Sequence, residues 1–310
     1  MTGMKRAVGI DIGGTKTAIG AVDVSGRIVA RTSFPTEAGA GFDLALRRIL
    51  EGIDRTLCEA GWSRRDLAGI GVGCPGPVNP TLGTIHNPYT LPTWNNCDIV
   101  SPLRAALGMP VFLENDADAA LLGETFAGSA RGCGKVVMIT FGTGIGTAVL
   151  VNGRIYRGCR GEHPEMGHIP VEEGGPDCYC GRRGCFEAVA SGEAIGAAGR
   201  AANLADSRAV FAAAAQGNTA ARQVIDRALR ATAIAAWTIL HTFLPERIVL
   251  GGGIAEAHYE LFAAPFRESV AAATMVPQSH ITITRAQLGN DAGLVGAAAL
   301  VFSDRSDRSV

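Results

Sequence analysis

The feature of this 310-residue sequence that most constrains its fold is an internal repeat of a glycine loop followed by a tight turn. In the first copy, the loop Ile12-Gly13-Gly14-Thr15 precedes the turn Ser25-Gly26. In the second copy, Phe141-Gly142-Thr143-Gly144 precedes Asn152-Gly153, and the two turns lie 127 residues apart. Solenoid and propeller repeats have periods of about 20–50 residues, so this is a single duplication. It predicts an α/β fold of two related lobes with a cleft between them.

Hydrophobic periodicity supports this organisation. Apolar segments rich in β-branched residues predict strands at 7–12 and 135–141, immediately before the two glycine loops. Helical periodicity covers 42–60, 116–126 and 220–244. The predicted lobes are residues 1–117 plus 291–310, and residues 118–290, with lengths suited to one core each.

Composition excludes several classes of function. The 28 basic and 29 acidic residues give a net charge of -1, which does not favour a nucleic-acid-binding protein. No apolar run reaches the 18 or so residues of a membrane span, and the polar residues 1–6 do not resemble a secretory signal. We therefore expect a folded cytoplasmic protein without nucleic-acid or membrane partners.

The two glycine loops are candidate phosphate sites. Glycine permits close backbone approach, so amide N–H groups at Asp11–Lys16 and at Gly142–Gly146 can face phosphate oxygens. Asp11 ends a strand where the Mg²⁺ of a nucleotide can be reached. Either loop alone is compatible with a ligand-free hairpin, but two matched loops favour a site built from both lobes. Neither loop is a Walker-type P-loop, because no G-x-x-x-x-G-K-[ST] occurs.

Three thiols are grouped within eight residues. Cys178, Cys180 and Cys185 follow His168, and a Cys₃His set suits tetrahedral Zn²⁺. Such a closed site leaves no position for a reactive water, so its expected role is structural. The alternative is a loop with three unliganded thiols.

A carboxylate pair follows a short predicted strand. Asp116, in Glu114-Asn115-Asp116, would begin a helix and could act as the base that deprotonates a hydroxyl attacking a γ-phosphoryl group. From spacing alone, a simple helix N-cap is the favoured interpretation of Asp116. Near the thiols, Glu165, His168 and Glu187 would be held in place by a zinc ion. One nitrogen of His168 can bind metal while the other meets a sugar hydroxyl.

Taken together, these motifs resemble the ROK family, a branch of the actin-like ATPase and hexokinase superfamily, from Val8 to about Val301. The motifs that carry the resemblance are Asp11–Lys16, Gly73–Val78, Glu114–Ala119, Gly142–Gly146, Glu165–His168, Cys178–Glu187 and Leu250–Gly253. The resemblance implies two RNase H-like lobes, a homodimer or homotetramer, and a hexose kinase that binds ATP with Mg²⁺ between its lobes.

The resemblance also assigns roles to residues of this sequence. Asp116 is the implied catalytic base. The implied sugar-binding residues are Gly76, Pro77, Asn115, Asp116, Glu165, His168 and Glu187. The residues implied around ATP and Mg²⁺ are Asp11, Gly13, Gly14, Thr15, Lys16, Thr143, Gly144, Gly252 and Gly253. The implied ligands of structural zinc are His168, Cys178, Cys180 and Cys185.

Two departures from the family pattern leave the sugar open. Thr90 stands where glucokinase-like members have asparagine, which the nearby Asn87 could replace, and His163-Pro164-Glu165 is similar to some fructokinase branches. Phosphorylation of the 6-hydroxyl of glucose is the leading expectation. Fructose, N-acetylglucosamine, N-acetylmannosamine and mannose are alternative substrates. A sugar-sensing repressor lacking its DNA-binding domain is a further alternative, although only six residues precede the first predicted strand. A zinc-dependent hydrolase is disfavoured, because all four zinc positions are used by the protein.

Overall fold

The computed structural model describes residues 6–159 and 161–302, which pack into two compact units. Within the described residues, the first unit contains 6–132, 154–163 (residue 160 apart) and 290–302, and the second contains 133–153 and 164–289. This division groups residues by packing. The lobe bounds predicted above, 1–117 plus 291–310 and 118–290, stay a prediction.

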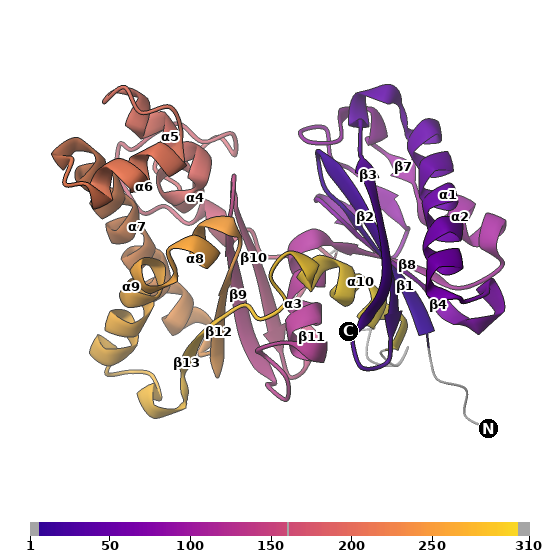
Figure 1. Ribbon diagram of the computed structural model, residues 1–310. Helices are drawn as coiled ribbons and strands as arrows, with labels where there is room; N and C mark the ends of the chain where they lie inside the picture. Colours follow the sequence, from indigo (N-terminus) through magenta and orange to yellow (C-terminus); the bar gives the residue numbers. More distant parts are fainter. Residues whose placement is uncertain (1–5, 160, 303–310) are drawn as a thin grey trace. The chain divides into compact units, whose positions relative to one another are not determined.

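The first unit is built on a five-stranded sheet of order β3-β2-β1-β4-β8 (Figure 1). Strands β1, β2 and β3 form an antiparallel meander, and β4 and β8 run parallel to β1. The bounds are β1 Arg6–Ile12, β2 Lys16–Asp23, β3 Ile28–Pro35, β4 Leu67–Cys74 and β8 Val111–Asn115. Helix α1 (Phe42–Ala60) covers one face of this sheet, and α10 (Ala292–Phe302) lies on the other with α3 (Asp116–Ala127).

The second unit repeats this plan. The sheet that contains its strands has the order β11-β10-β9-β12-β13, in which β9 and β10 are antiparallel while β12 and β13 run parallel to β9. The edge strand β11 falls in the segment 154–163, which is grouped with the first unit. The bounds are β9 Lys135–Phe141, β10 Ile145–Val151, β11 Arg154–Ile155, β12 Arg247–Gly251 and β13 Thr282–Arg285. Both sheets therefore place a glycine loop between the first two strands of a hairpin. The predicted α/β class and the duplication are confirmed.

Seven further α-helices complete the described residues, and α7 corresponds to the helix predicted at 220–244. Their bounds are α2 Val100–Leu107, α4 Phe186–Ala190, α5 Gly192–Arg200, α6 Ser207–Ala215, α7 Thr219–Phe243, α8 Gly253–Ala257 and α9 Tyr259–Ala272. Helix α1 shows why the periodicity was sufficient: Ala45, Ile49 and Ile53 are buried along one stripe, and Gly61 ends the helix with a left-handed φ of 65°. The short helices α4 and α8 were not predicted.

The chain between β4 and α2 forms a small inserted sheet. Strands β5 (Val78–Asn79), β6 (Thr84–Ile85) and β7 (Cys97–Asp98) form it, and the side chains of Leu91 and Trp94 anchor the segment in the first unit's core. Two-residue strands produce no hydrophobic alternation, so the sequence pattern could not reveal them.

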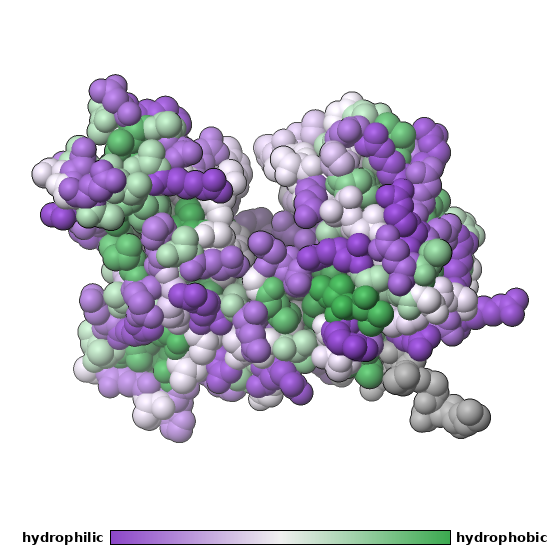
Figure 2. All heavy atoms as spheres, in the orientation of Figure 1, coloured by the Kyte–Doolittle hydropathy of each residue, from purple (hydrophilic) through white to green (hydrophobic). Residues whose placement is uncertain are grey.

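The surface shows no broad apolar band on the face drawn in Figure 2, where apolar patches of limited extent alternate with polar residues. Among the described residues, no helix has both the length and the apolar character required to cross a membrane.

Candidate active site

The buried residue Thr36 holds the first glycine loop in place through hydrogen bonds. The Thr36 hydroxyl donates to the Gly13 carbonyl at 2.7 Å and lies 2.9 Å from the hydroxyl of Thr17. The Thr36 amide donates to the Thr15 carbonyl at 3.0 Å. Both contacts occupy carbonyl groups of the loop, and the Gly13 amide donates to the Lys16 carbonyl at 2.9 Å, so the loop conformation is fixed by hydrogen bonds.

Asp11 lies at the end of β1, beside the first residues of α10. A Cβ atom at Gly293 would lie 3.0 Å from the Asp11 carboxylate, so glycine is required there for the close approach. Burial raises the pKa of Asp11 to about 6, and the charge of Asp116 adds to the effect, whereas Arg31 and Lys16 oppose it. A cation near Asp11 would favour its ionised form.

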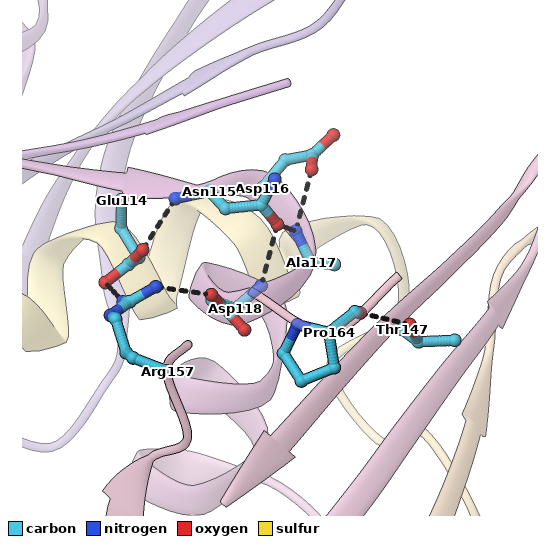
Figure 3. A network of polar contacts seen from close by, with 8 residues as sticks. All are labelled: Glu114, Asn115, Asp116, Ala117, Asp118, Thr147, Arg157 and Pro164. Carbon is cyan, nitrogen blue, oxygen red and sulfur yellow. Dashed lines mark hydrogen bonds and ion pairs between the residues drawn. The ribbon is translucent and has the colours of Figure 1, made fainter. Parts of the chain in front are cut away.

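The start of α3 excludes the N-cap interpretation of Asp116. Asn115 is the N-cap: its Oδ1 accepts from the amides of Ala117 and Asp118 at 2.8 and 3.3 Å. Asp116 is therefore the first residue of the helix and not its cap. Its Oδ1 accepts from the Ala117 amide at 2.8 Å, and its carboxylate points away from Arg157 (Figure 3). The capping requirement of α3 is thus met without Asp116.

Gly76 packs against this corner, and Pro77 follows it after a cis peptide bond. A Cβ atom at Gly76 would lie 2.7 Å from Asn115 Nδ2 and 3.7 Å from His163 Nε2. Any larger side chain at position 76 would displace the Asn115 amide. Gly76 therefore controls the position of Asn115, which explains a glycine in the predicted pocket wall.

The side-chain amide of Asn87 makes all of its hydrogen bonds to residues of its own segment, between β4 and α2. Its Nδ2 donates to the Thr90 hydroxyl at 2.6 Å and to the Pro75 carbonyl at 3.2 Å, and its Oδ1 accepts from the amides of Tyr89 and Thr90. The side chain is also buried. The expectation that Asn87 replaces a missing sugar-binding asparagine is therefore not supported by its geometry.

In the second unit, Glu187 joins the second glycine loop to the helix that follows the thiols. Its Oε2 accepts from the Ile145 amide at 2.7 Å, and a Cβ atom at Gly144 would lie 2.6 Å from the same oxygen. Gly144 must therefore be glycine for this contact. Thr143 lies in the same loop, where its carbonyl accepts from the amide of Glu193.

Thr147 and Tyr179, which the sequence analysis did not identify, hold the predicted sugar-binding residues in place. Thr147 of β10 is buried; its hydroxyl donates to the Pro164 carbonyl at 2.8 Å and accepts from the Met166 amide at 3.1 Å, which fixes the chain on both sides of Glu165. Tyr179 lies edge-on to the His168 ring, with centroids 5.0 Å apart, and hydrogen-bonds Glu187. An aromatic residue between two cysteines was the only sequence signal for Tyr179.

The four predicted zinc ligands come together. One ligand atom from each of His168, Cys178, Cys180 and Cys185 lies within 4.8 Å of all the others. Cys178 Sγ lies 3.4 Å from His168 Nδ1, and Cys180 Sγ lies 3.5 Å from Cys185 Sγ. Ligands at the usual bond lengths of tetrahedral zinc, about 2.0–2.3 Å, are separated by about 3.4–3.8 Å. The donor set and its spacing therefore fit a zinc ion, and they leave His168 Nε2 on the other side of the ring.

The loop after β12 brings the backbone close to β9. Gly252 has a left-handed φ of 85°, and a Cβ atom on it would lie 2.5 Å from the Phe141 carbonyl oxygen. A Cβ atom on Gly253, the first residue of α8, would have no neighbour within 4 Å. The predicted site residues thus form one group in each unit. Asp11, Asn115 and Asp116 belong to the first, and Thr143, Glu165 and His168 to the second.

Comparison with protein families gives a match to the ROK family over residues 7–304. A glucokinase from Thermotoga maritima is 35% identical over 313 residues, which cover 96% of this chain and 97% of that protein. An N-acetylmannosamine kinase from Citrobacter koseri is also 35% identical, over 297 residues that cover 96% of this chain and 98% of that protein.

Solved structures agree with these sequence relationships. A ROK hexokinase from Thermus thermophilus superposes with a TM-score of 0.84 at 35% identity, covering 96% of this chain and 98% of that one. A ROK family glucokinase from Streptomyces griseus, in complex with glucose and AMPPNP, gives a TM-score of 0.77 at 29% identity and covers 95% and 98% of the two chains.

Proposed function

This chain belongs to the ROK family, and we propose that it is an ATP-dependent hexose kinase that phosphorylates the 6-hydroxyl of glucose with Asp116 as general base. The observation that carries this proposal is that two neighbouring residues at the start of α3 have different roles. Asn115 caps the helix, so Asp116 keeps a carboxylate for chemistry at the position of the family's base.

The mechanism assigns separate tasks to the residues around the sugar and to those around the phosphates. Asp116 accepts the proton of the attacking hydroxyl, while Gly76, Pro77, Asn115, Glu165, His168 and Glu187 orient the sugar. Phosphoryl transfer is catalysed mainly by positioning and electrostatic stabilisation. The amides of the two glycine loops, together with Lys16, would supply that stabilisation around the phosphates. When bound, Mg²⁺ neutralises phosphate charge, and Asp11 is the carboxylate that would hold it, directly or through water.

Zinc is proposed as a structural ion. Bound by His168 Nδ1 and the thiolates of Cys178, Cys180 and Cys185, it would fix the ring of His168 and leave Nε2 to meet a sugar hydroxyl. Gly252 and Gly253 are proposed to lie beside adenosine. We also propose a cytoplasmic homodimer or homotetramer.

Glucose is preferred because a glucokinase is among the most similar relatives and a glucokinase with bound glucose shares the fold. N-acetylmannosamine is the second candidate, because a kinase for that sugar is equally identical to this chain. The two sugars differ at carbon 2, so the choice depends on the room beside that carbon.

A sugar panel tests the proposal. ADP release would be measured with Mg-ATP and glucose, N-acetylmannosamine, N-acetylglucosamine, mannose or fructose, at matched concentrations. We expect the highest kcat/KM with glucose. A higher kcat/KM with N-acetylmannosamine would favour the second candidate, and the absence of ADP release with every sugar would contradict the kinase assignment.

A further inference from the structure

Three charged side chains meet around the start of α3. Arg157 Nη1 donates to Asp118 Oδ2 at 3.0 Å, and Arg157 Nη2 donates to Glu114 Oε2 (Figure 3). The side chains of Glu114 and Asp118 are 7% and 0% exposed, and that of Arg157 is 25% exposed. Buried charges are expensive unless they are paired and hydrogen-bonded, so this cluster requires each of its members.

The two carboxylates flank the residues that the proposed mechanism uses. Glu114 is the penultimate residue of β8, and its Oε1 accepts from the Asn115 amide at 2.7 Å. Asp118 lies in the first turn of α3, where its amide donates to the Asn115 side chain. The bridge through Arg157 therefore closes a ring of contacts around the strand-to-helix corner that carries Asn115 and Asp116.

Arg157 reaches this corner from a distant part of the sequence. It is 43 residues from Glu114 and belongs to the segment 154–163. That segment packs with the first unit, although the chain on either side of it, 133–153 and 164–289, belongs to the second. The corner is thus braced by a segment outside β8 and α3.

We propose that Arg157 is a positioning residue: by bridging Glu114 and Asp118, it fixes the corner from which Asp116 meets the sugar hydroxyl. This inference rests on the proposed kinase function. A guanidinium suits the task because its planar fork presents donors to two carboxylates at once, which the point charge of lysine does not reproduce. Misplacement of a catalytic group by about 1 Å can cost on the order of 100-fold in rate.

A purely electrostatic role makes a different prediction. If Arg157 only compensates the buried carboxylates, then removing all three charges together should restore both stability and activity. If Arg157 positions the corner, removing all three charges should restore stability alone, because the bridge stays absent.

The experiment compares Arg157→Met with the triple variant Arg157→Met, Glu114→Gln, Asp118→Asn. We expect the single variant to lose thermal stability and to show a kcat for glucose about 10–100-fold below wild type. The triple variant should regain the wild-type Tm but keep a kcat at least about 10-fold low, with its KM for Mg-ATP within about twofold of wild type. A triple variant with wild-type kcat, or a single variant with wild-type kcat, would overturn the proposal.

Arg157→Lys provides a second test that does not depend on the triple variant folding. It keeps the positive charge, so we expect a Tm near wild type and a kcat about 10-fold lower; wild-type kcat in this variant would also overturn the proposal. Arg64→Lys is the matched control, because Arg64 donates from both Nε and Nη2 to the Asp54 carboxylate on the exposed surface. Failure of the wild-type protein to phosphorylate any sugar would overturn the kinase function itself, whereas turnover that is insensitive to Arg157 would overturn only its positioning role.

Discussion

Thr36 illustrates how a residue outside a motif sets the motif's geometry. Its hydroxyl donates to the Gly13 carbonyl, and its amide donates to the Thr15 carbonyl. Thr36→Val keeps the shape and the amide contact but removes the hydroxyl, which leaves buried polar groups unsatisfied at a cost of about 1–2 kcal/mol. We expect the KM for ATP to rise about 5–20-fold, with the KM for sugar unchanged, in steady-state kinetics.

Thr36→Ser is the control for this prediction, because it retains the hydroxyl. It should keep a KM for ATP near the wild-type value. An unchanged KM for ATP in Thr36→Val would show that the backbone contacts hold the loop without the hydroxyl.

Asp118 makes stability depend on pH. Burial raises its pKa to about 7 from 3.8, with the charge of Glu114 adding and Arg157 opposing. The native state therefore holds more protons than the unfolded chain between these values, and this group makes stability fall as pH rises through that window. Asp118→Asn removes the titrating group, so between pH 5 and pH 8 the free energy of unfolding of wild type should fall by about 1–3 kcal/mol more than that of Asp118→Asn.

Denaturant unfolding at several pH values measures this difference. Asp54→Asn, which replaces a carboxylate on the exposed surface, is the control and should follow the wild-type pH dependence. Parallel curves for Asp118→Asn and wild type would contradict the raised pKa of Asp118.

At the scale of elements, the proposed zinc motif links a loop to the sugar-binding residues. Removing the ion with a chelator, or one ligand with Cys180→Ser, should lower the Tm by on the order of 5–10 °C. The affinity for glucose should fall with it, because His168 and Glu187 would lose their support. Calorimetry with and without added Zn²⁺ measures both effects.

Cys58→Ser is the matched control, since Cys58 is exposed and distant from the motif in sequence. It should change neither property. If chelation leaves both the Tm and the glucose affinity unchanged, the cluster does not hold a structural metal.

Glycine residues allow helix α10 to pack closely against its neighbours α3 and β4. A Cβ atom at Gly296 would overlap the Ala119 carbonyl oxygen of α3, and one at Gly71 would overlap the Ala297 carbonyl oxygen. Alanine is normally favoured over glycine inside a helix by about 1 kcal/mol. Gly296→Ala should nevertheless reduce the free energy of unfolding by about 3 kcal/mol or more, because backbone must move to make room.

Gly39→Ala is the control for this packing effect, since a Cβ atom there would have no neighbour within 4 Å. Its change in the free energy of unfolding should stay within about 0.5 kcal/mol, as measured by denaturant titration. Equal stability of Gly296→Ala and wild type would show that α3 and α10 can separate without cost.

At the scale of the whole molecule, local patterns predicted the elements well. The helix at 42–60 and the strand at 135–141 have the predicted bounds, because amphipathic and β-branched runs report directly on burial. The duplicated glycine loops predicted two related α/β lobes, and the two sheets share one strand order.

Contacts between distant segments were beyond the reach of those patterns. Arg157 looks like an ordinary charged residue in the sequence, and its partners lie 39 and 43 residues away. The cap of α3 shows a subtler limit: both Asn115 and Asp116 suit an N-cap by composition, and only the backbone conformation assigns it to Asn115. Asn87 looked available for sugar until its loop contacts were seen.

The central claim is that Asp116 is the base of a hexose kinase, and Asp116→Asn tests it most directly. ADP release would be measured with saturating glucose and Mg-ATP, and glucose binding by calorimetry on the same preparations. The account predicts a kcat about 10²–10⁴-fold below wild type, with the Kd for glucose within a few-fold. A kcat within a few-fold of wild type would contradict the assignment of Asp116 as the base.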